Sequence, residues 1–112
     1  MPEMKKIYLG CPYSSDDPAV REYRFEQVNI KAGELMKRGH IVYSPISHSH
    51  PIAMACGLPL GFDFWEAQDR SFIEWSDEVW FLMLAGWDRS SGMCREHEIA
   101  IEKGKPVRWI KP

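Results

Sequence analysis

Four short apolar runs alternate along the chain with segments of helical periodicity. The runs cover residues 6–11, 40–44, 78–84 and 107–110, and Gly, Pro or Asp residues bound them. Runs of this length between such breakers are typical of strands. Strands that alternate with helices form parallel sheets with right-handed crossovers. The pattern therefore predicts a small three-layer α/β/α domain with a flavodoxin- or Rossmann-like parallel sheet of four to five strands.

A helix is expected in each of the three intervals between the runs. The first begins after Asp17, whose side chain suits a helix cap, and it ends before a glycine. The other two cover about residues 62–75 and 93–103. Residues 46–61 have no clear period and are expected to form a long loop. The 112 residues fit one domain of this kind, which would span residues 1–112.

The composition excludes several classes of function. Fourteen Lys+Arg against sixteen Asp+Glu give a net charge of -2, whereas binding to a nucleic-acid polymer needs a basic excess. No apolar run approaches the roughly 18 residues of a membrane span. Cys11, Cys56 and Cys94 are scattered, so they predict neither a disulfide framework nor a zinc site. We therefore expect a cytoplasmic protein that contacts neither a membrane nor a nucleic-acid polymer.

The ligand site is expected at one edge of the predicted sheet. Ligands of parallel sheets bind beyond the carboxyl ends of the strands, which selects residues 11–17, 45–61 and 85–92. The chain has neither a Walker loop nor a GxGxxG fingerprint. The candidate site is therefore built from individual side chains in and near these segments.

Two carboxylates are candidates because each interrupts an apolar helix face. Glu96 shares a face with Ile99 and Ala100, where a carboxylate is costly unless a partner or a reaction uses it. The nearby helix N-terminus is expected to keep Glu96 ionised, as attack on a sugar carbon requires. A desolvated Asp69 could hold or protonate a leaving group. The alternatives are a surface Glu96 and an Asp69 that pairs with a nearby Lys or Arg.

The turn before the last helix carries further candidates. Ser90, Ser91 and Gly92 precede a helix N-terminus, where N–H groups and hydroxyls can hold an anion or a sugar hydroxyl. Plain N-capping explains the same residues. Trp87, in the same turn, is a candidate for stacking on a base.

The other two segments contribute a tight turn and a histidine pair. Gly10 begins the turn, which carries Tyr13 and Ser14. His48 and His50 suggest a substrate contact, hydrogen bonding within a loop, or a metal. Two His without a third ligand make a poor zinc site, so no metal is expected.

Three segments together resemble the nucleoside 2-deoxyribosyltransferase superfamily. Its opening motif resembles IYLGCPYS at the first strand, its middle segment resembles FWEAQDRSFIEWSDEVWFLM, and its signature resembles GWDRSSGMCREHEIAIEKGKPV. The signature is a small polar turn, a Gly, a Glu four residues later, an Ala four residues after that, and then Gly-Lys-Pro. These segments cover most of the chain in the family's order, and the likeness is greatest to a branch of short bacterial and phage proteins.

The resemblance implies a role for each main candidate. In characterised members the signature Glu attacks the anomeric carbon, which places this role on Glu96. A Tyr of the first strand orients that Glu, here Tyr8, and an upstream acid contacts the base, here Asp69. Members that act on nucleoside monophosphates bind the phosphate through serines near the turn. The matching serines are Ser14, Ser90 and Ser91.

The reaction implied by the resemblance is a double displacement on a small nucleoside or nucleotide. Glu96 expels the base and forms a glycosyl ester, as in retaining glycosidases, and a second base or water resolves the ester without a cofactor. Ser90 stands where the transferases carry Asp, which favours N-glycosidic hydrolysis over base exchange. The alternatives are a nucleotide-binding module without turnover and a flavodoxin-like flavin binder. A homo-oligomer is expected, because a 112-residue parallel sheet with five Trp leaves apolar surface to cover.

Overall fold

The computed structural model describes residues 4–59 and 61–112. Its sheet has four strands in the spatial order β2-β1-β3-β4, and every neighbouring pair is parallel. The strands are β1 (Lys6–Gly10), β2 (Ile41–Tyr43), β3 (Glu78–Leu82) and β4 (Val107–Ile110).

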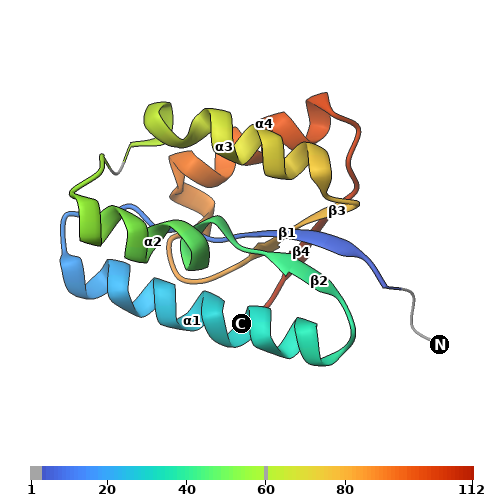
Figure 1. Cartoon of the computed structure of the whole chain (residues 1–112), viewed down its shortest axis with the longest axis horizontal. Helices are drawn as coiled ribbons and strands as arrows, with labels where there is room; N and C mark the ends of the chain where they lie inside the picture. Colours follow the sequence, from blue (N-terminus) through green and yellow to red (C-terminus); the bar gives the residue numbers. More distant parts are fainter. Residues whose placement is uncertain (1–3, 60) are drawn as a thin grey trace.

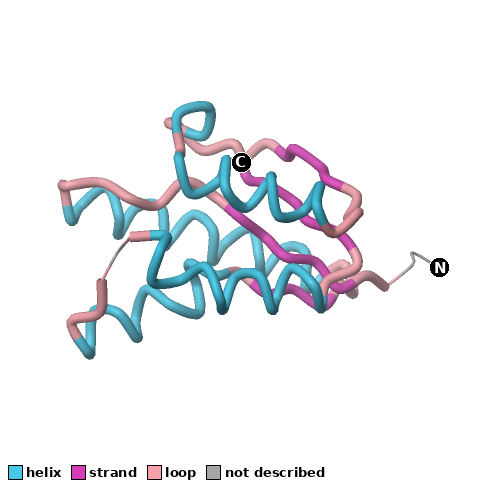
Figure 2. The backbone as a smooth tube through the Cα atoms, turned by 90° about the horizontal axis from the view of Figure 1, so that it is seen from above, coloured by secondary structure: helices cyan, strands magenta, loops and turns pink. Residues whose placement is uncertain are grey.

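Four helices complete three layers around the sheet. They are α1 (Pro18–Lys37), α2 (Pro45–Cys56), α3 (Phe62–Trp75) and α4 (Ser91–Glu102). The helix α1 covers one face of the sheet, α3 and α4 cover the other, and α2 packs beside α1 (Figure 1). Seen from above, the helices run along the strands (Figure 2). The predicted three-layer architecture is confirmed, and within the described ranges no helix is long and apolar enough to cross a membrane.

The central strand β1 sends its side chains alternately into two cores. Ile7 and Leu9 belong to the core under α1, whereas Tyr8 belongs to the core under α3 and α4. The strand β3, paired with β1 on one side and β4 on the other, is buried along its whole length. The alternation along β1 therefore directs the phenol of Tyr8 toward the layer that carries Asp69 and Glu96.

The strand order reverses between β1 and β3. From β1 the chain crosses through α1 to β2 on one side, and it later reaches β3 on the other side of β1. Open α/β sheets bind their ligands outside the carboxyl ends of the strands at such a reversal. The functional site is therefore expected between the segments that follow β1 and β3.

The expectation of a long loop over residues 46–61 is wrong, because α2 occupies most of that segment. The Ser44 side chain caps this helix by accepting a hydrogen bond from a backbone N–H of its first turn. The buried face of α2 carries His50 and Ala53, and Pro51 lies inside the helix. A polar residue on the buried face and an interior proline together hide the helical period in the sequence.

Gly10 is the last residue of β1, and it lies against the ring of Phe81 on β3. A Cβ at this position would lie 2.9 Å from two ring carbons of Phe81, whereas a Cβ at Gly33 in α1 would meet nothing within 4 Å. We expect Gly10→Ala to lower the free energy of unfolding by about 1–3 kcal/mol through overpacking. Gly33→Ala is the matched control and should raise it by roughly 0.5–1 kcal/mol, because Ala is the better helix former. Thermal unfolding of both variants checks this pair, and an unchanged midpoint for Gly10→Ala would contradict it.

Candidate active site

Glu96 lies on the buried face of α4, together with Met93, Ile99 and Ala100. Glu96 is only 6% exposed, and its Oε2 accepts a hydrogen bond from the hydroxyl of Tyr8. Tyr8 is fully buried. The alternative of a surface Glu96 is therefore wrong, and β1 and α4 bring the phenol and the carboxyl into contact.

Asp69 lies on the buried face of α3, one turn before the buried Ile73. Its negative charge raises the pKa of both Glu96 and Tyr8, so the three groups form one electrostatic cluster. Among the described residues, no Lys or Arg side chain contributes to the pKa shift of Asp69. The alternative of an Asp69 neutralised by a basic side chain is therefore wrong.

Both carboxyl groups hold their protons more tightly than carboxyl groups in water. Burial, with the charge of Asp69 added, raises the pKa of Glu96 to about 8, although the hydrogen bond from Tyr8 opposes this shift. Burial also raises the pKa of Asp69 to about 7. The expectation that the helix N-terminus keeps Glu96 ionised is wrong at neutral pH, because desolvation outweighs a dipole effect of roughly 0.3–1 kcal/mol. Near pH 7–8 the two groups titrate as a coupled pair.

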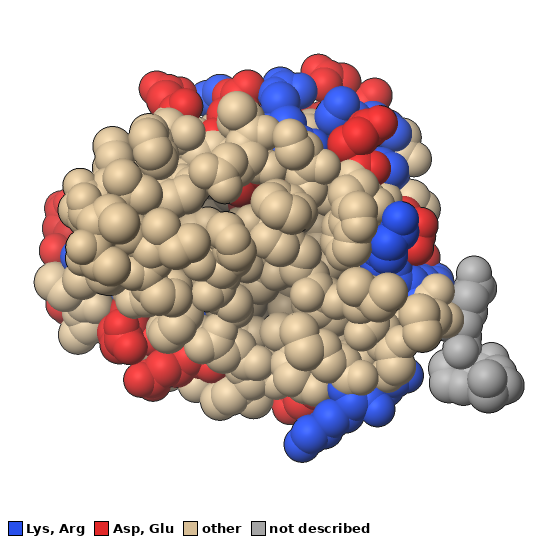
Figure 3. All heavy atoms as spheres, viewed as in Figure 1, with Lys and Arg blue, Asp and Glu red and all other residues tan. Residues whose placement is uncertain are grey.

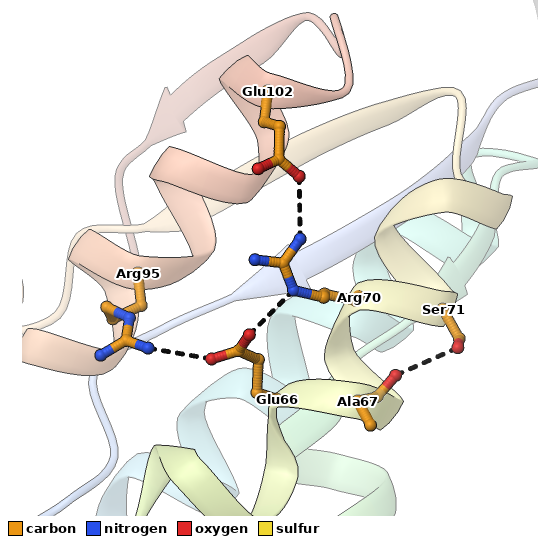
Figure 4. A network of polar contacts seen from close by, with 6 residues as sticks. All are labelled: Glu66, Ala67, Arg70, Ser71, Arg95 and Glu102. Carbon is orange, nitrogen blue, oxygen red and sulfur yellow. Dashed lines mark hydrogen bonds and ion pairs between the residues drawn. The ribbon is translucent and has the colours of Figure 1, made fainter.

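An ion-pair network ties α3 to α4 (Figure 4). Arg70 Nε lies 2.9 Å from Glu66 Oε2, and Arg70 Nη1 lies 2.8 Å from Glu102 Oε2. Arg95 Nη2 lies 2.9 Å from the other oxygen of Glu66. Exposed ion pairs contribute little to stability individually, but the network joins the helix segments that carry the two buried carboxyl groups.

An open pocket of about 80 Å³ lies over the carboxyl pair. Its polar lining includes both carboxyl groups, and Ile46, Phe62 and Trp65 provide apolar walls from α2 and α3. In Figure 3 the charged side chains lie mostly around the rim of the view, and the largely uncharged middle is hollowed at one point, where red Asp or Glu atoms are visible inside. Apolar walls with a few convergent polar groups are typical of small-molecule sites.

A second cavity, of about 230 Å³, adjoins the pocket. It shares Ser14, Ser90 and Gly92 with the pocket, and it is also lined by Arg24 and Arg89. Two guanidinium groups, serine hydroxyls and the N-terminus of α4 are donors for an anion. The two cavities together offer an acidic, partly apolar compartment beside a basic one.

The predicted site residues divide between these compartments. Tyr13, Ser14, Ser90, Gly92, Asp69 and Glu96 line the pocket, and Ser91 lines the second cavity. Gly10 lies beneath the pocket, where an added Cβ would be 3.5 Å from Glu96 Oε2. The Ser90 side chain also accepts the N–H of Met93, so capping and pocket lining coexist in one residue.

His48 and Trp87 do not line either cavity in the described parts of the chain. The ring of His48 lies 5.5 Å from that of Tyr43, and Trp87 lies 5.5 Å from Trp109. The residue of the histidine pair that lines the pocket is His50. Over residues 4–59 and 61–112, no three His, Cys, Asp or Glu side chains converge as a metal site needs.

The sequence suggested a substrate contact for the pair His48 and His50 without separating the two, and it gave no indication of Glu22, the partner of His50. His50 lies between Tyr13 and Glu22 and is 7% exposed. The spacing of Ile46, His50 and Ala53 at i, i+4 and i+7 is the signal for an inward-facing histidine. Pro51, which argued against a helix, masked that signal.

The comparisons with known proteins agree with this fold. A family model described as "Domain of unknown function (DUF1937)" matches residues 5–111. A 2-deoxyribosyltransferase from the psychrotolerant bacterium Bacillus psychrosaccharolyticus has a similar structure, with a TM-score of 0.68 and 24% sequence identity over 96% of this chain and 72% of that one. No curated protein matches the sequence. The fold that the resemblance to the deoxyribosyltransferase superfamily implied is thus confirmed.

Proposed function

We propose that this chain, which belongs to the family described as a domain of unknown function (DUF1937), cleaves the N-glycosidic bond of a nucleoside or nucleoside 5′-monophosphate. The observation that carries the proposal is the buried Glu96–Tyr8 contact, with Asp69 beside it, in an open pocket. A carboxyl pair of this kind supplies both a nucleophile and a proton donor. The similar fold of a protein named as a 2-deoxyribosyltransferase supports a ligand that joins a sugar to a base.

In the first step, the Glu96 carboxylate attacks the anomeric carbon of the sugar as the bond to the base breaks. Tyr8 engages Oε2, so we assign the attack to Oε1. The electron pair of the broken bond moves to the base, which takes a proton from Asp69, whose raised pKa suits an acid near neutral pH. The products are the free base and a glycosyl ester on Glu96, as in retaining glycosidases.

In the second step, water or a second base attacks the anomeric carbon of the ester. The ester bond breaks, Glu96 becomes a carboxylate again, and the ionised Asp69 accepts the proton of the attacking group. Attack by water gives hydrolysis, and attack by a base gives exchange. The chain, the substrate and water account for every proton and electron pair in both steps.

The second cavity supports a 5′-phosphate on the substrate. Arg89 lines this cavity and its side chain is 84% exposed, so its removal should not disturb the core. We expect Arg89→Ala to lower kcat/KM for a nucleoside 5′-monophosphate by roughly three- to tenfold and to leave the unphosphorylated nucleoside unaffected. Arg38→Ala, at the far end of α1, is the matched control for loss of one exposed positive charge. An equal loss for both substrates would contradict a phosphate contact.

A second candidate function is a nucleotide-binding module without turnover. The raised pKa of Glu96 favours this alternative, because a protonated carboxyl is a poor nucleophile. The deciding experiment offers deoxynucleosides and their 5′-monophosphates, with and without a second free base, and measures free base and exchanged nucleoside by chromatography. Free base without an acceptor indicates hydrolysis, and a new nucleoside only with an acceptor indicates transfer. Saturable binding with no product at any pH from 6 to 9 would overturn the proposed reaction in favour of the binding module.

A further inference from the structure

Three side chains from separate segments form a chain of hydrogen bonds on the α1–α2 side of the pocket. The hydroxyl of Tyr13, in the segment after β1, lies 2.5 Å from His50 Nδ1. His50 Nε2, on α2, lies 2.9 Å from Glu22 Oε2 on α1. Tyr13 and His50 line the pocket, and the Glu22 side chain is 54% exposed. The proposed reaction uses none of these contacts.

The orientation of the imidazole of His50 is fixed from several sides. The ring of Phe25 lies 4.4 Å from it at a tilt of 31°, and the ring of Tyr13 meets it edge-on at 5.5 Å. Both ring nitrogens of His50 have hydrogen-bond partners, so a ring flip would break both contacts. The direction of each hydrogen bond is therefore a property of the site.

That direction follows from the chemistry of the three groups. A carboxylate only accepts hydrogen bonds, so in the imidazole with one ring proton that proton lies on Nε2 and points to Glu22. His50 Nδ1 is then an acceptor, and the Tyr13 hydroxyl donates its single proton to it. Burial raises the pKa of Tyr13, and the Arg21 guanidinium, which faces its oxygen, lowers it. Tyr13 has no further proton to give, so what it offers a ligand is a lone pair on its oxygen.

We infer that Tyr13 is a hydrogen-bond acceptor for the ligand, and that His50 and Glu22 are positioning residues that fix this polarity. The inference rests on the proposed function for the class of ligand. The pocket then selects a ligand that presents a hydrogen-bond donor at Tyr13. In a nucleoside that donor is either a sugar hydroxyl or an exocyclic amine of the base. A ligand with an acceptor at this point binds more weakly, because its lone pair faces the lone pair of the Tyr13 oxygen without a proton between them.

The test reverses the polarity from outside the pocket with Glu22→Lys. An ammonium only donates, so His50 Nε2 becomes the acceptor, Nδ1–H donates to the Tyr13 oxygen, and the Tyr13 proton is free for the ligand. Dissociation constants are measured calorimetrically in a Glu96→Gln background, in which the ligand survives. The probes are 2′-deoxyadenosine, 2′-deoxyinosine, whose base edge has the opposite donor and acceptor pattern, and 2′,3′-dideoxyadenosine, which lacks the 3′-hydroxyl.

In the protein that retains Glu22, we expect either 2′-deoxyinosine or 2′,3′-dideoxyadenosine to bind about tenfold more weakly than 2′-deoxyadenosine. Weaker 2′-deoxyinosine identifies the base amine as the donor, and weaker 2′,3′-dideoxyadenosine identifies the 3′-hydroxyl. Glu22→Lys should abolish or invert that preference, and Tyr13→Phe should abolish it. Glu26→Lys, on the next turn of α1 and also exposed, makes the same charge change and should leave the preference intact.

The outcomes separate this inference from the proposed reaction. A preference that stays the same in Glu22→Lys or in Tyr13→Phe overturns the inference, even if the wild-type chain releases base. A preference that follows Glu22 supports the inference, even if no base is released. Failure of all three probes and of their 5′-monophosphates to bind overturns both, because the ligand class is then wrong.

Discussion

Glu96→Gln should reduce the release of free base by at least roughly 10³-fold in kcat/KM, because an amide oxygen cannot form the glycosyl ester. The Gln side chain keeps the size of Glu and retains an acceptor for the Tyr8 hydroxyl, so the pocket keeps its shape. Nucleoside binding should change far less than turnover. Chromatography of the base, together with intact mass spectrometry of acid-quenched wild-type protein, checks both the loss and the expected sugar adduct.

Two controls make the result of Glu96→Gln specific. Glu98→Gln removes an exposed carboxylate from the same helix and should leave turnover unchanged.

The second control is the stability of Glu96→Gln as a function of pH. The pKa of Glu96 is about 8 in the folded chain against an ordinary value of 4.5, so its stabilising contribution is complete below pH 4.5 and is lost as the pH rises through 8. Glu96→Gln should therefore gain stability relative to the wild type, on the order of 5 kcal/mol, as the pH rises from 4.5 to 8.

Equal base release by the wild type and by Glu96→Gln would contradict the nucleophile assignment. A stability difference between Glu96→Gln and the wild type that does not grow from pH 4.5 to 8 would contradict the raised pKa of Glu96. These two results are independent, because the first concerns the reaction and the second concerns the folded protein alone.

The architecture and the two carboxyl groups were predictable from local patterns. Apolar runs and the apolar faces of helices indicate which residues are buried. Glu96 and Asp69 each interrupt an apolar helix face that packs in the core. The charge state was not predictable in this way, because it depends on how deeply α3 and α4 together desolvate the pair. The helix dipole, which local sequence does indicate, is the smaller of the two effects.

The residues that sequence reasoning misplaced depend on tertiary packing. His48 and His50 differ by two positions, and only the helical turn of α2 decides which of them faces the pocket. Trp87 packs against Trp109 on the edge strand β4, and these two residues are distant in sequence. Trp75, Trp87 and Trp109 remain 37–43% exposed, which supports the predicted homo-oligomer. That assembly and the cytoplasmic location stay predictions.

Asp69→Asn should lower base release by about 10²-fold and change the shape of its pH dependence. The wild-type reaction needs one proton on the pair, with Glu96 ionised and Asp69 protonated. This is the less populated of the two singly protonated forms, because the pKa of Glu96 is higher than that of Asp69. With pKa values of about 7 and about 8, release should peak between these values and fall on either side. Below pH 7 both groups are protonated and the nucleophile is lost, and above pH 8 both are ionised and the acid is lost.

In Asp69→Asn the alkaline fall should disappear, because the group that loses its proton is gone. The acid limb should also move to lower pH, since the charge of Asp69 is one of the causes that raise the pKa of Glu96. The measurement is kcat/KM for base release from pH 5.5 to 9.5 for both proteins, with the exposed Asp63→Asn on the same helix as the matched control. An alkaline limb that persists in Asp69→Asn would assign the proton donor to another group. An acid limb that does not move would mean that the two carboxyl groups titrate independently, against the coupling that their shared burial predicts.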